Sequence, residues 1–230
     1  MPDPNNASKP PGNRAATRGG SDLLLVLRKF LSNAKTVATV APSSRALSRA
    51  ILRGIDWSKA RTVVELGAGT GPITAELVKA APLGTRLVVN EFLPDFCQAL
   101  RQKFPGLDVV EGDARRLTEM LAERGLAQVD YVLSGLPLTH FPPADRDAVI
   151  DQCGRFLGAI GEFRQLTTAP WLYRKLYRRY FREVSFRLIA WNLPPGGVYY
   201  CRGWIPPEER AASLVSRPAG GDNSIGMPPL

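Results

Sequence analysis

The residues best suited to chemistry form a glycine-rich stretch that runs from Glu65 to Gly71. The stretch reads Glu-Leu-Gly-Ala-Gly-Thr-Gly, follows the apolar run Thr62–Leu66 and precedes a helical pattern that starts at Pro72. Glycine adopts positive φ angles and lets a ligand approach the backbone closely. The first N–H groups of a helix have no intrahelical partner, so they can face that ligand. The stretch predicts a strand, a tight turn and a helix start around a nucleotide-type ligand.

The spacing of the glycines separates two kinds of nucleotide pocket. A dinucleotide fingerprint has the order G-x-G-x-x-G, and its third glycine would fall at Pro72. The order here is E-x-G-x-G-x-G, which resembles motif I of the class I methyltransferases that use S-adenosylmethionine (SAM). The alternative is an ordinary strand–turn–helix with incidental glycines.

An acid at the end of the next strand supports a ligand with a ribose. The predicted strand Arg86–Phe92 contains Glu91, 20 residues beyond Gly71. A carboxylate there can accept hydrogen bonds from both ribose hydroxyls, and Phe92 offers an apolar wall for adenine. A solvated acid at a strand end is the plain alternative for Glu91.

A second acid, Asp113, directly follows the predicted third strand Asp108–Glu111. In the class I methyltransferases that this pattern resembles, an acid at this position accepts a hydrogen bond from the adenine amino group. A simple helix N-cap is the alternative. The residues expected to hold SAM share the carboxyl ends of the first four strands and are Glu65, Gly67, Ala68, Gly69, Gly71, Glu91, Phe92, Gly112, Asp113, Ala114, Ser134 and Gly135.

The loop after the predicted fourth strand, Val129–Ser134, indicates the substrate. Enzymes that methylate the amino nitrogens of bases, including ribosomal RNA adenine dimethylases, carry N/D-[PIL]-P-[YFW] there. This chain has Gly135-Leu136-Pro137-Leu138, without the polar side chain and without the aromatic ring. A base would lose a stacking contact worth about 1–3 kcal/mol. The loop therefore counts against a nucleic-acid substrate. We expect its three apolar residues, Leu136, Pro137 and Leu138, to contact a different kind of substrate. The alternative is that the loop is only a structural turn.

The complete order of motifs resembles the bacterial phospholipid N-methyltransferases. An amphipathic helix pattern and Ala41-Pro42-Ser43-Ser44 precede motif I, and Asn90-Glu91-Phe92, Gly112-Asp113-Ala114 and Ser134-Gly135-Leu136-Pro137-Leu138 follow it. The resemblance implies methyl transfer from SAM to the amine of phosphatidylethanolamine, towards phosphatidylcholine, with S-adenosylhomocysteine as the other product. Ornithine-lipid N-methyltransferases share the pattern, and ribosomal RNA adenine dimethylases are related, so both activities are alternatives. A non-catalytic SAM-fold binding module is a further one.

The composition of the chain limits which partners and which kinds of site the protein can have. The 230 residues include 30 Lys and Arg against 21 Asp and Glu, which gives a net charge of +9 and favours a polyanionic partner, either nucleic acid or an anionic membrane. A basic surface without a partner is the alternative. One histidine and three separated cysteines indicate neither a metal site nor a disulfide framework. With no apolar run of about 18 residues and no signal-peptide pattern, we expect a cytoplasmic protein bound peripherally to the inner face of the membrane.

The order of elements predicts the fold. Strands alternate with helices and end in a hairpin of Val184–Trp191 and Gly197–Trp204, which indicates an α/β, doubly wound, Rossmann-like sheet of seven strands. Residues 1–20 and 206–230 are polar and should be disordered. The methyltransferase domain would span residues 21–205.

Two basic segments are candidates for contact with an anionic membrane. Residues 21–35 carry leucines and Phe30 on one helical stripe, with lysine and arginine off it, as an amphipathic interfacial helix would. Residues 171–182 predict a second helix, in which Arg174, Arg178 and Arg182 recur every four residues among aromatic side chains. Packing of both helices on the domain is the alternative for each, and RNA binding is a further one for the second.

The catalytic step requires a neutral amine, whereas a free primary ammonium has a pKa near ~10. His140 lies in the loop after the predicted fourth strand, which we call the substrate loop. It is a candidate general base, or a candidate hydrogen-bond donor to a phosphate. Tyr199 and Tyr200, together with Tyr173 or Tyr177, are candidates for an aromatic cage around the methylated cation. Ordinary packing is the alternative for each tyrosine, and an ordinary loop position for the histidine.

Overall fold

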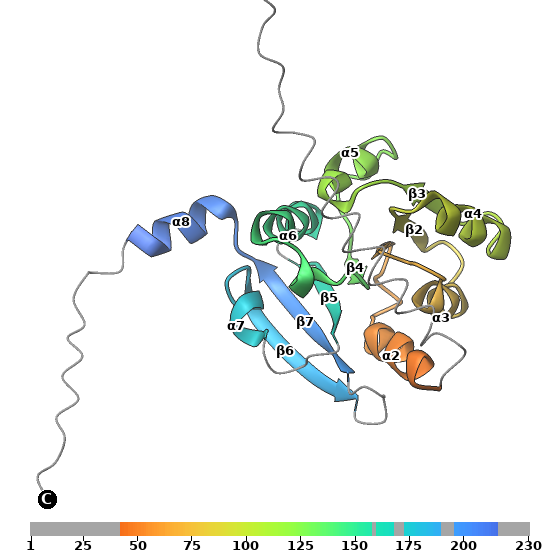
Figure 1. Ribbon diagram of the computed structural model, residues 1–230, viewed down its shortest axis with the longest axis horizontal. Helices are drawn as coiled ribbons and strands as arrows, with labels where there is room; N and C mark the ends of the chain where they lie inside the picture. Colours follow the sequence, from red (N-terminus) through yellow and green to blue (C-terminus); the bar gives the residue numbers. More distant parts are fainter. Residues whose placement is uncertain (1–41, 158–159, 168–172, 190–195, 216–230) are drawn as a thin grey trace, which may run out of the picture.

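The carboxyl ends of the central strands meet at one edge of a seven-stranded sheet, with helices on both faces (Figure 1). The computed structural model describes residues 42–157, 160–167, 173–189 and 196–215. The strands are ordered β3-β2-β1-β4-β5-β7-β6. They are β1 (Thr62–Leu66), β2 (Arg86–Glu91), β3 (Asp108–Glu111), β4 (Tyr131–Ser134), β5 (Glu162–Thr167), β6 (Phe181–Ile189) and β7 (Gly196–Trp204). The predicted Rossmann-like sheet is confirmed, and the predicted helix 21–35 lies outside the described residues.

The helices divide between the two faces. They are α2 (Pro42–Leu52), α3 (Pro72–Ala80), α4 (Pro94–Lys103), α5 (Leu117–Ala122), α6 (Pro143–Leu157), α7 (Arg174–Tyr177) and α8 (Pro207–Val215), with 3-10 turns η1 (Ala114–Arg116) and η2 (Leu138–His140). One apolar cluster joins α2 and α3 to the sheet, and a larger one joins α5, α6 and α7 to the opposite face. Because both faces are covered, all five residues of β1 are buried.

The register aligns the ends of the strands. Leu66 pairs with Asn90 of β2 and with Ser134 of β4, and Ser134 pairs with Gln165 of β5. Strands β1 to β5 run in parallel, so their last residues and the loops that follow lie at the same edge. We call this edge the carboxyl edge. Ligands of open parallel sheets bind there.

Helix α2 is fastened to the sheet at its carboxyl end. The guanidinium of Arg164 donates hydrogen bonds to the carbonyls of Ile51 at 2.7 Å and Arg53 at 3.0 Å. The Tyr200 hydroxyl donates to the Ala50 carbonyl at 2.7 Å. The last carbonyls of a helix have no intrahelical donor, so these bonds satisfy them. Arg164 is 1% exposed and is neutralised by Glu162 at 2.8 Å.

The predicted basic helix over residues 171–182 is wrong for most of its described part. Only the four residues of α7 are helical, and the chain has entered β6 by Phe181. From Phe181 onward the chain pairs with β7, with Phe181 opposite Trp204, which overrides the helical spacing of the arginines. Arg182 therefore lies on a strand, and the three arginines do not share one helix face.

Helix α8 occupies a segment for which the sequence predicted disorder. Residues Pro207–Val215 are helical, with Glu208 and Glu209 in the first turn, where acids stabilise a helix. Arg210 pairs with Asp151 of α6 at 2.6 Å. This contact ties the start of α8 to the domain, while its far end extends away from the sheet (Figure 1).

Candidate active site

The glycine turn after β1 forms the floor of the site. Gly67, Gly69 and Gly71 have φ angles of 69°, 55° and 81°, in the left-handed region that favours glycine. The N–H groups of Gly67 and Ala68 donate to the Asn90 carbonyl at 2.9 and 3.3 Å. A Cβ at Gly67 would lie 2.5 Å from the Leu136 Cδ2 atom. The turn thus packs directly against the loop after β4, and a side chain at Gly67 would separate them.

Glu91 is held against this turn by three backbone donors. Its Oε2 atom accepts from the Gly69 N–H at 2.7 Å, and its Oε1 atom accepts from the N–H groups of Phe92 and Leu93 at 2.9 Å each. The residue is 3% exposed. The structure therefore brings the predicted acid of β2 to the predicted glycine turn of β1.

Glu65 is a carboxyl group with one unused oxygen. Its Oε2 atom accepts from the Thr74 hydroxyl at 2.8 Å, whereas its Oε1 atom is buried and has no partner among the described residues. Burial raises the pKa of Glu65 to about 8, and the hydrogen bond from Thr74 opposes this. A buried, unpaired acceptor is uncommon and calls for a donor. A cationic ligand group at the carboxyl edge would supply one.

Asp113 caps the 3-10 turn η1, so the N-cap alternative describes its position. Its Oδ1 atom accepts from the Arg115 N–H at 2.9 Å, and Arg115 Nε donates to Oδ2 at 2.9 Å. Arg115 also donates from NH1 to Asp145 of α6 at 2.7 Å. Hydrogen bonds to both carboxylates raise the pKa of Arg115 further above its usual value. Next to it, the Gly112 N–H donates to the Glu91 carbonyl at 3.0 Å, which fixes the β3 loop to β2.

The loop after β4 turns its apolar side chains inward. Leu136 and Leu138 are 6% and 1% exposed and belong to the cluster under α6, and Pro137 is buried. These three side chains fill the core, and the expected contact of this loop with a substrate stays a prediction. Ser134 is also buried, and the Gly135 N–H donates to the Leu66 carbonyl at 2.9 Å.

Gln165 is a residue of this site that the sequence did not reveal. Its Nε2 atom donates to the carbonyls of Leu136 at 2.8 Å and Leu166 at 2.7 Å. The side chain is 1% exposed, and its Oε1 atom is buried without a partner among the described residues. Both neighbours of the nitrogen are carbonyl oxygens, so the orientation of the amide is fixed. Gln165 therefore holds the backbone of the loop after β4 from the neighbouring strand.

Two sequence comparisons identify the class of enzyme. A family model described as a methyltransferase domain matches residues 63–161. The ornithine lipid N-methyltransferase of Singulisphaera acidiphila is 45% identical over 185 residues, which cover 79% of this chain and 96% of the relative. The chain belongs to the class I SAM-dependent methyltransferases. SAM is therefore the methyl donor and S-adenosylhomocysteine the product, as the sequence predicted.

Solved structures of methyltransferases share the fold. The 1,6-didemethyltoxoflavin N1-methyltransferase of Burkholderia thailandensis, solved with S-adenosylhomocysteine, is 17% identical, with a TM-score of 0.61 over 86% of this chain and 93% of that chain. An O-methyltransferase of Bacillus cereus, also solved with S-adenosylhomocysteine, is 13% identical, with a TM-score of 0.55 over 79% and 90% of the two chains. These similarities concern the fold alone.

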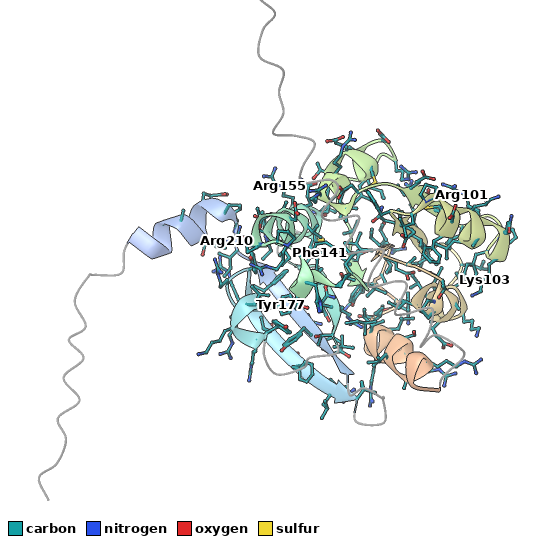
Figure 2. All side chains as sticks on the ribbon, viewed as in Figure 1. Arg101, Lys103, Phe141, Arg155, Tyr177 and Arg210 are labelled. Carbon is teal, nitrogen blue, oxygen red and sulfur yellow. The ribbon has the colours of Figure 1, made fainter. Side chains whose placement is uncertain are left out.

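The two tyrosines predicted to form one cage in this methyltransferase lie on opposite faces of the sheet. Tyr199 is fully buried on the α6 face, with ring centroids 4.8 Å from Tyr177 and 4.7 Å from Phe186. Tyr200 faces α2 and donates its hydroxyl to Ala50. Neighbouring residues of a strand point to opposite faces, so the pair cannot surround one cation. The prediction of a shared cage is wrong, and Figure 2 shows Tyr177 within the packed interior between α7 and the sheet.

His140 lies at the carboxyl edge of the methyltransferase, at the end of η2. Its side chain is exposed, and its Nδ1 atom lies 3.2 Å from the Thr139 hydroxyl. Its backbone N–H donates to the Pro137 carbonyl at 2.8 Å, which holds it on the loop after β4. In the described ranges, no group of three His, Cys, Asp or Glu side chains could hold a metal ion.

Proposed function

We propose that this methyltransferase transfers methyl groups from SAM to the headgroup amine of an ornithine lipid. The observation that carries the proposal is the 45% identity to the ornithine lipid N-methyltransferase of Singulisphaera acidiphila, over 96% of that enzyme. The sequence alone favoured phosphatidylethanolamine and held ornithine lipid as an alternative. Both headgroups carry a primary amine beside an anion, a carboxylate in ornithine and a phosphodiester in phosphatidylethanolamine. The identity to this relative therefore favours ornithine lipid as the substrate.

The loop after β4 supports a lipid amine over a nucleic-acid base. Leu138 stands where base methyltransferases carry an aromatic ring, and its side chain is 1% exposed. Phe141, the next aromatic residue of the loop, is also buried. A flipped base needs a stacking surface in its pocket. Neither residue offers one, whereas a small aliphatic ammonium needs none.

The residues around the glycine turn fit SAM. When bound, SAM supplies an activated methyl group on a sulfonium, together with an ammonium, a ribose and an adenine. The unpaired Oε1 atom of Glu65 suits a cationic group. Glu91, fixed at the turn by three N–H groups, suits the ribose hydroxyls, and Asp113 suits the adenine amino group. The chain thereby contributes binding and orientation, which can lower a barrier by several kcal/mol, up to about 10.

The amine must lose a proton before it can attack. His140 is exposed on the substrate loop, and in this proposal it accepts that proton or contacts the headgroup anion. Gln165 holds the Leu136 carbonyl and so sets the position of the loop that carries His140. Tyr199 and Tyr200 do not take part as bases, because burial raises the pKa of both hydroxyls.

The enzyme would work at the inner membrane surface as a peripheral protein. None of the helices in the described part of the chain is long and apolar enough to cross a membrane. Arg174, Lys175 and Arg178 are exposed on and beside α7, and the sequence predicts this segment, like residues 21–35, as a candidate for contact with an anionic surface. No nucleic-acid partner is part of this proposal.

Incubation with methyl-labelled SAM tests the proposed substrate. Purified protein is mixed in parallel with vesicles that contain ornithine lipid, with vesicles that contain phosphatidylethanolamine, and with ribosomal RNA. We expect label in the ornithine lipid. Label only in phosphatidylethanolamine would return the assignment to phospholipid, and label only in RNA would reject a lipid substrate altogether.

A further inference from the structure

A groove outside the SAM site lies between α2, α3 and the edge strand β6. Its volume is about 530 Å³, and its walls include Arg49 and Arg53 from the α2 segment and Arg187 and Ile189 from β6. The groove is on the α2 face of the sheet, whereas α7 and the substrate loop pack on the other face. It is thus a separate surface from the basic segment 171–182.

The walls of the groove carry an excess of positive charge. Arg49 is bonded to Glu76 at 3.1 Å, the one acid among the lining residues. Arg53 and Arg187 are exposed, and neither has an ion pair within the part of the chain that the structure describes. Arg45 is exposed one turn before Arg49, and α2 contains no acid. The groove therefore presents guanidinium groups that are available to an anion.

The floor of the groove is apolar. Ala50 is 6% exposed, and Trp57 and Ile189 are half-buried along the same surface. Tryptophan favours the level of the lipid headgroups, where its ring meets both apolar and polar surroundings. Arginine packs its methylene stem on apolar surface and keeps its charge in the polar layer. A rim of arginine around a floor with tryptophan matches the boundary of a bilayer.

The groove reaches the edge of the sheet that carries the active site. Leu188 of β6 and Thr167 of β5 both pair with Gly197, so the ends of these two strands lie at the same level. Ile189, which lines the groove, is one residue further towards that edge. The end of the groove at Ile189 therefore lies near the carboxyl edge, whereas Arg53, which also lines a second hollow with Glu162 and Glu183, lies towards the opposite edge of the sheet.

We propose that the groove between α2 and β6 docks the enzyme on an anionic lipid bilayer, with Arg53 and Arg187 against the lipid phosphates. This inference rests on the proposed lipid substrate, because an enzyme that methylates headgroups must bring the carboxyl edge to a membrane. The end of the groove with Arg187 and Ile189 would lie nearest to the carboxyl edge and the headgroups. The groove is a positioning surface and holds no reacting atom.

Sedimentation with vesicles tests the groove without using catalysis. The full chain is mixed with phosphatidylglycerol–phosphatidylcholine vesicles in the absence of SAM and of any amine lipid substrate. The double variant R53E/R187E should bind at least about 30-fold more weakly, since each lost cation contributes on the order of a few-fold to tenfold and each new acid repels the surface. R53Q/R187Q should show a smaller loss. Both arginines are exposed, so circular dichroism should report an unchanged fold.

A matched variant and a second assay separate the possible causes. R155E reverses an exposed arginine on α6, on the other face of the sheet (Figure 2), and should bind vesicles like the original protein. R53E/R187E should keep its affinity for SAM and its methyl transfer to substrate dispersed in detergent. Unchanged sedimentation of R53E/R187E, an equal loss in R155E, or retention by RNA rather than vesicles would overturn the docking proposal. If the protein methylates no lipid but sedimentation depends on the groove, the proposed function fails and the docking surface stands.

Discussion

The Oε2 atom of Glu91 accepts a hydrogen bond of 2.7 Å from the backbone N–H of Gly69, which lies 22 residues earlier in the chain. The bond joins the acid at the end of β2 to the glycine turn at the end of β1. Two further N–H groups, of Phe92 and Leu93, fix the other carboxylate oxygen. The proposed SAM site is therefore assembled by contacts between the ends of two strands, within the protein itself.

Replacing Glu91 by Ala should weaken SAM binding by at least about tenfold. Hydrogen bonds to a charged group contribute about 1.5–3 kcal/mol each, and the change removes the acceptor for the ribose as well as the brace of the turn. Isothermal titration calorimetry measures the affinity. Glu111 supplies the control, because it pairs with Glu91 in the sheet and is exposed. Equal affinities of E91A and E111A would remove Glu91 from the SAM site.

Stability without SAM should fall as the pH rises from about 4.5 to 8. Burial raises the pKa of Glu65 from 4.5 to about 8 in the folded chain, so the unfolded chain loses its proton first. Between these values the folded state binds more protons, and each unit of pH lowers the free energy of unfolding by at most about 1.4 kcal/mol. Urea unfolding at several pH values measures the slope. The side chain of the Glu65→Gln variant cannot ionise, so its free energy of unfolding should decline less steeply with pH. A slope equal to that of the original protein would contradict the assignment of this pH dependence to Glu65.

Replacing Gln165 by Leu should slow methyl transfer and leave SAM affinity nearly unchanged. The change removes the Gln165 donor and leaves the Leu136 carbonyl with the Leu138 N–H alone, at 2.8 Å, so it should cost about 0.5–1.5 kcal/mol of stability. We expect kcat to fall by roughly tenfold, because a displaced loop misplaces the substrate. Gln102→Leu, at an exposed position of α4, is the control and should behave like the original protein. A change in SAM affinity alone would assign Gln165 to the cofactor instead.

Replacing Arg115 by Ala should affect both stability and SAM binding. Arg115 joins Asp113 of the β3 loop to Asp145 at the start of α6, and the pair Arg115–Asp113 is largely shielded from solvent. Loss of a partner leaves two carboxylates uncompensated, so we expect a loss of about 1–3 kcal/mol in unfolding free energy. SAM affinity should fall by several-fold because Asp113 is no longer held. Asp145→Asn keeps the pair with Asp113, so its SAM affinity should stay close to that of the original protein.

The sequence predicted the part of the fold that depends on local patterns. Strand β1 and helix α3 have the predicted bounds, since an apolar run buried on both faces and a proline at a helix start are local signals. The arginine spacing in residues 171–182 misled the prediction, because pairing with β7 converts the segment from Phe181 into a strand. Helix α8 was missed because its anchor, the pair of Arg210 with Asp151, joins residues far apart in the chain.

In the candidate site, too, features with a local sequence pattern could be predicted and features that depend on distant neighbours could not. The positions of Glu65, Glu91 and Asp113 at the carboxyl edge could be predicted because the ends of parallel strands meet at one edge, and their contact with SAM stays a prediction. Gln165 and Arg115 could not be predicted, since a single polar residue with no characteristic spacing gives no signal before its neighbours are known. Tyr199 and Tyr200 were grouped by their adjacency in sequence, although adjacency in a strand places two side chains on opposite faces.

The most direct test of the proposed activity is the ratio of kcat/KM for two amine lipids in the same vesicles. Vesicles with equal amounts of ornithine lipid and phosphatidylethanolamine are incubated with the protein and labelled SAM, and the methylated lipids are separated by chromatography, with a reaction that contains no protein as the control. Our account predicts that ornithine lipid takes up most of the label. A ratio that favours phosphatidylethanolamine, or label in neither lipid, would contradict it.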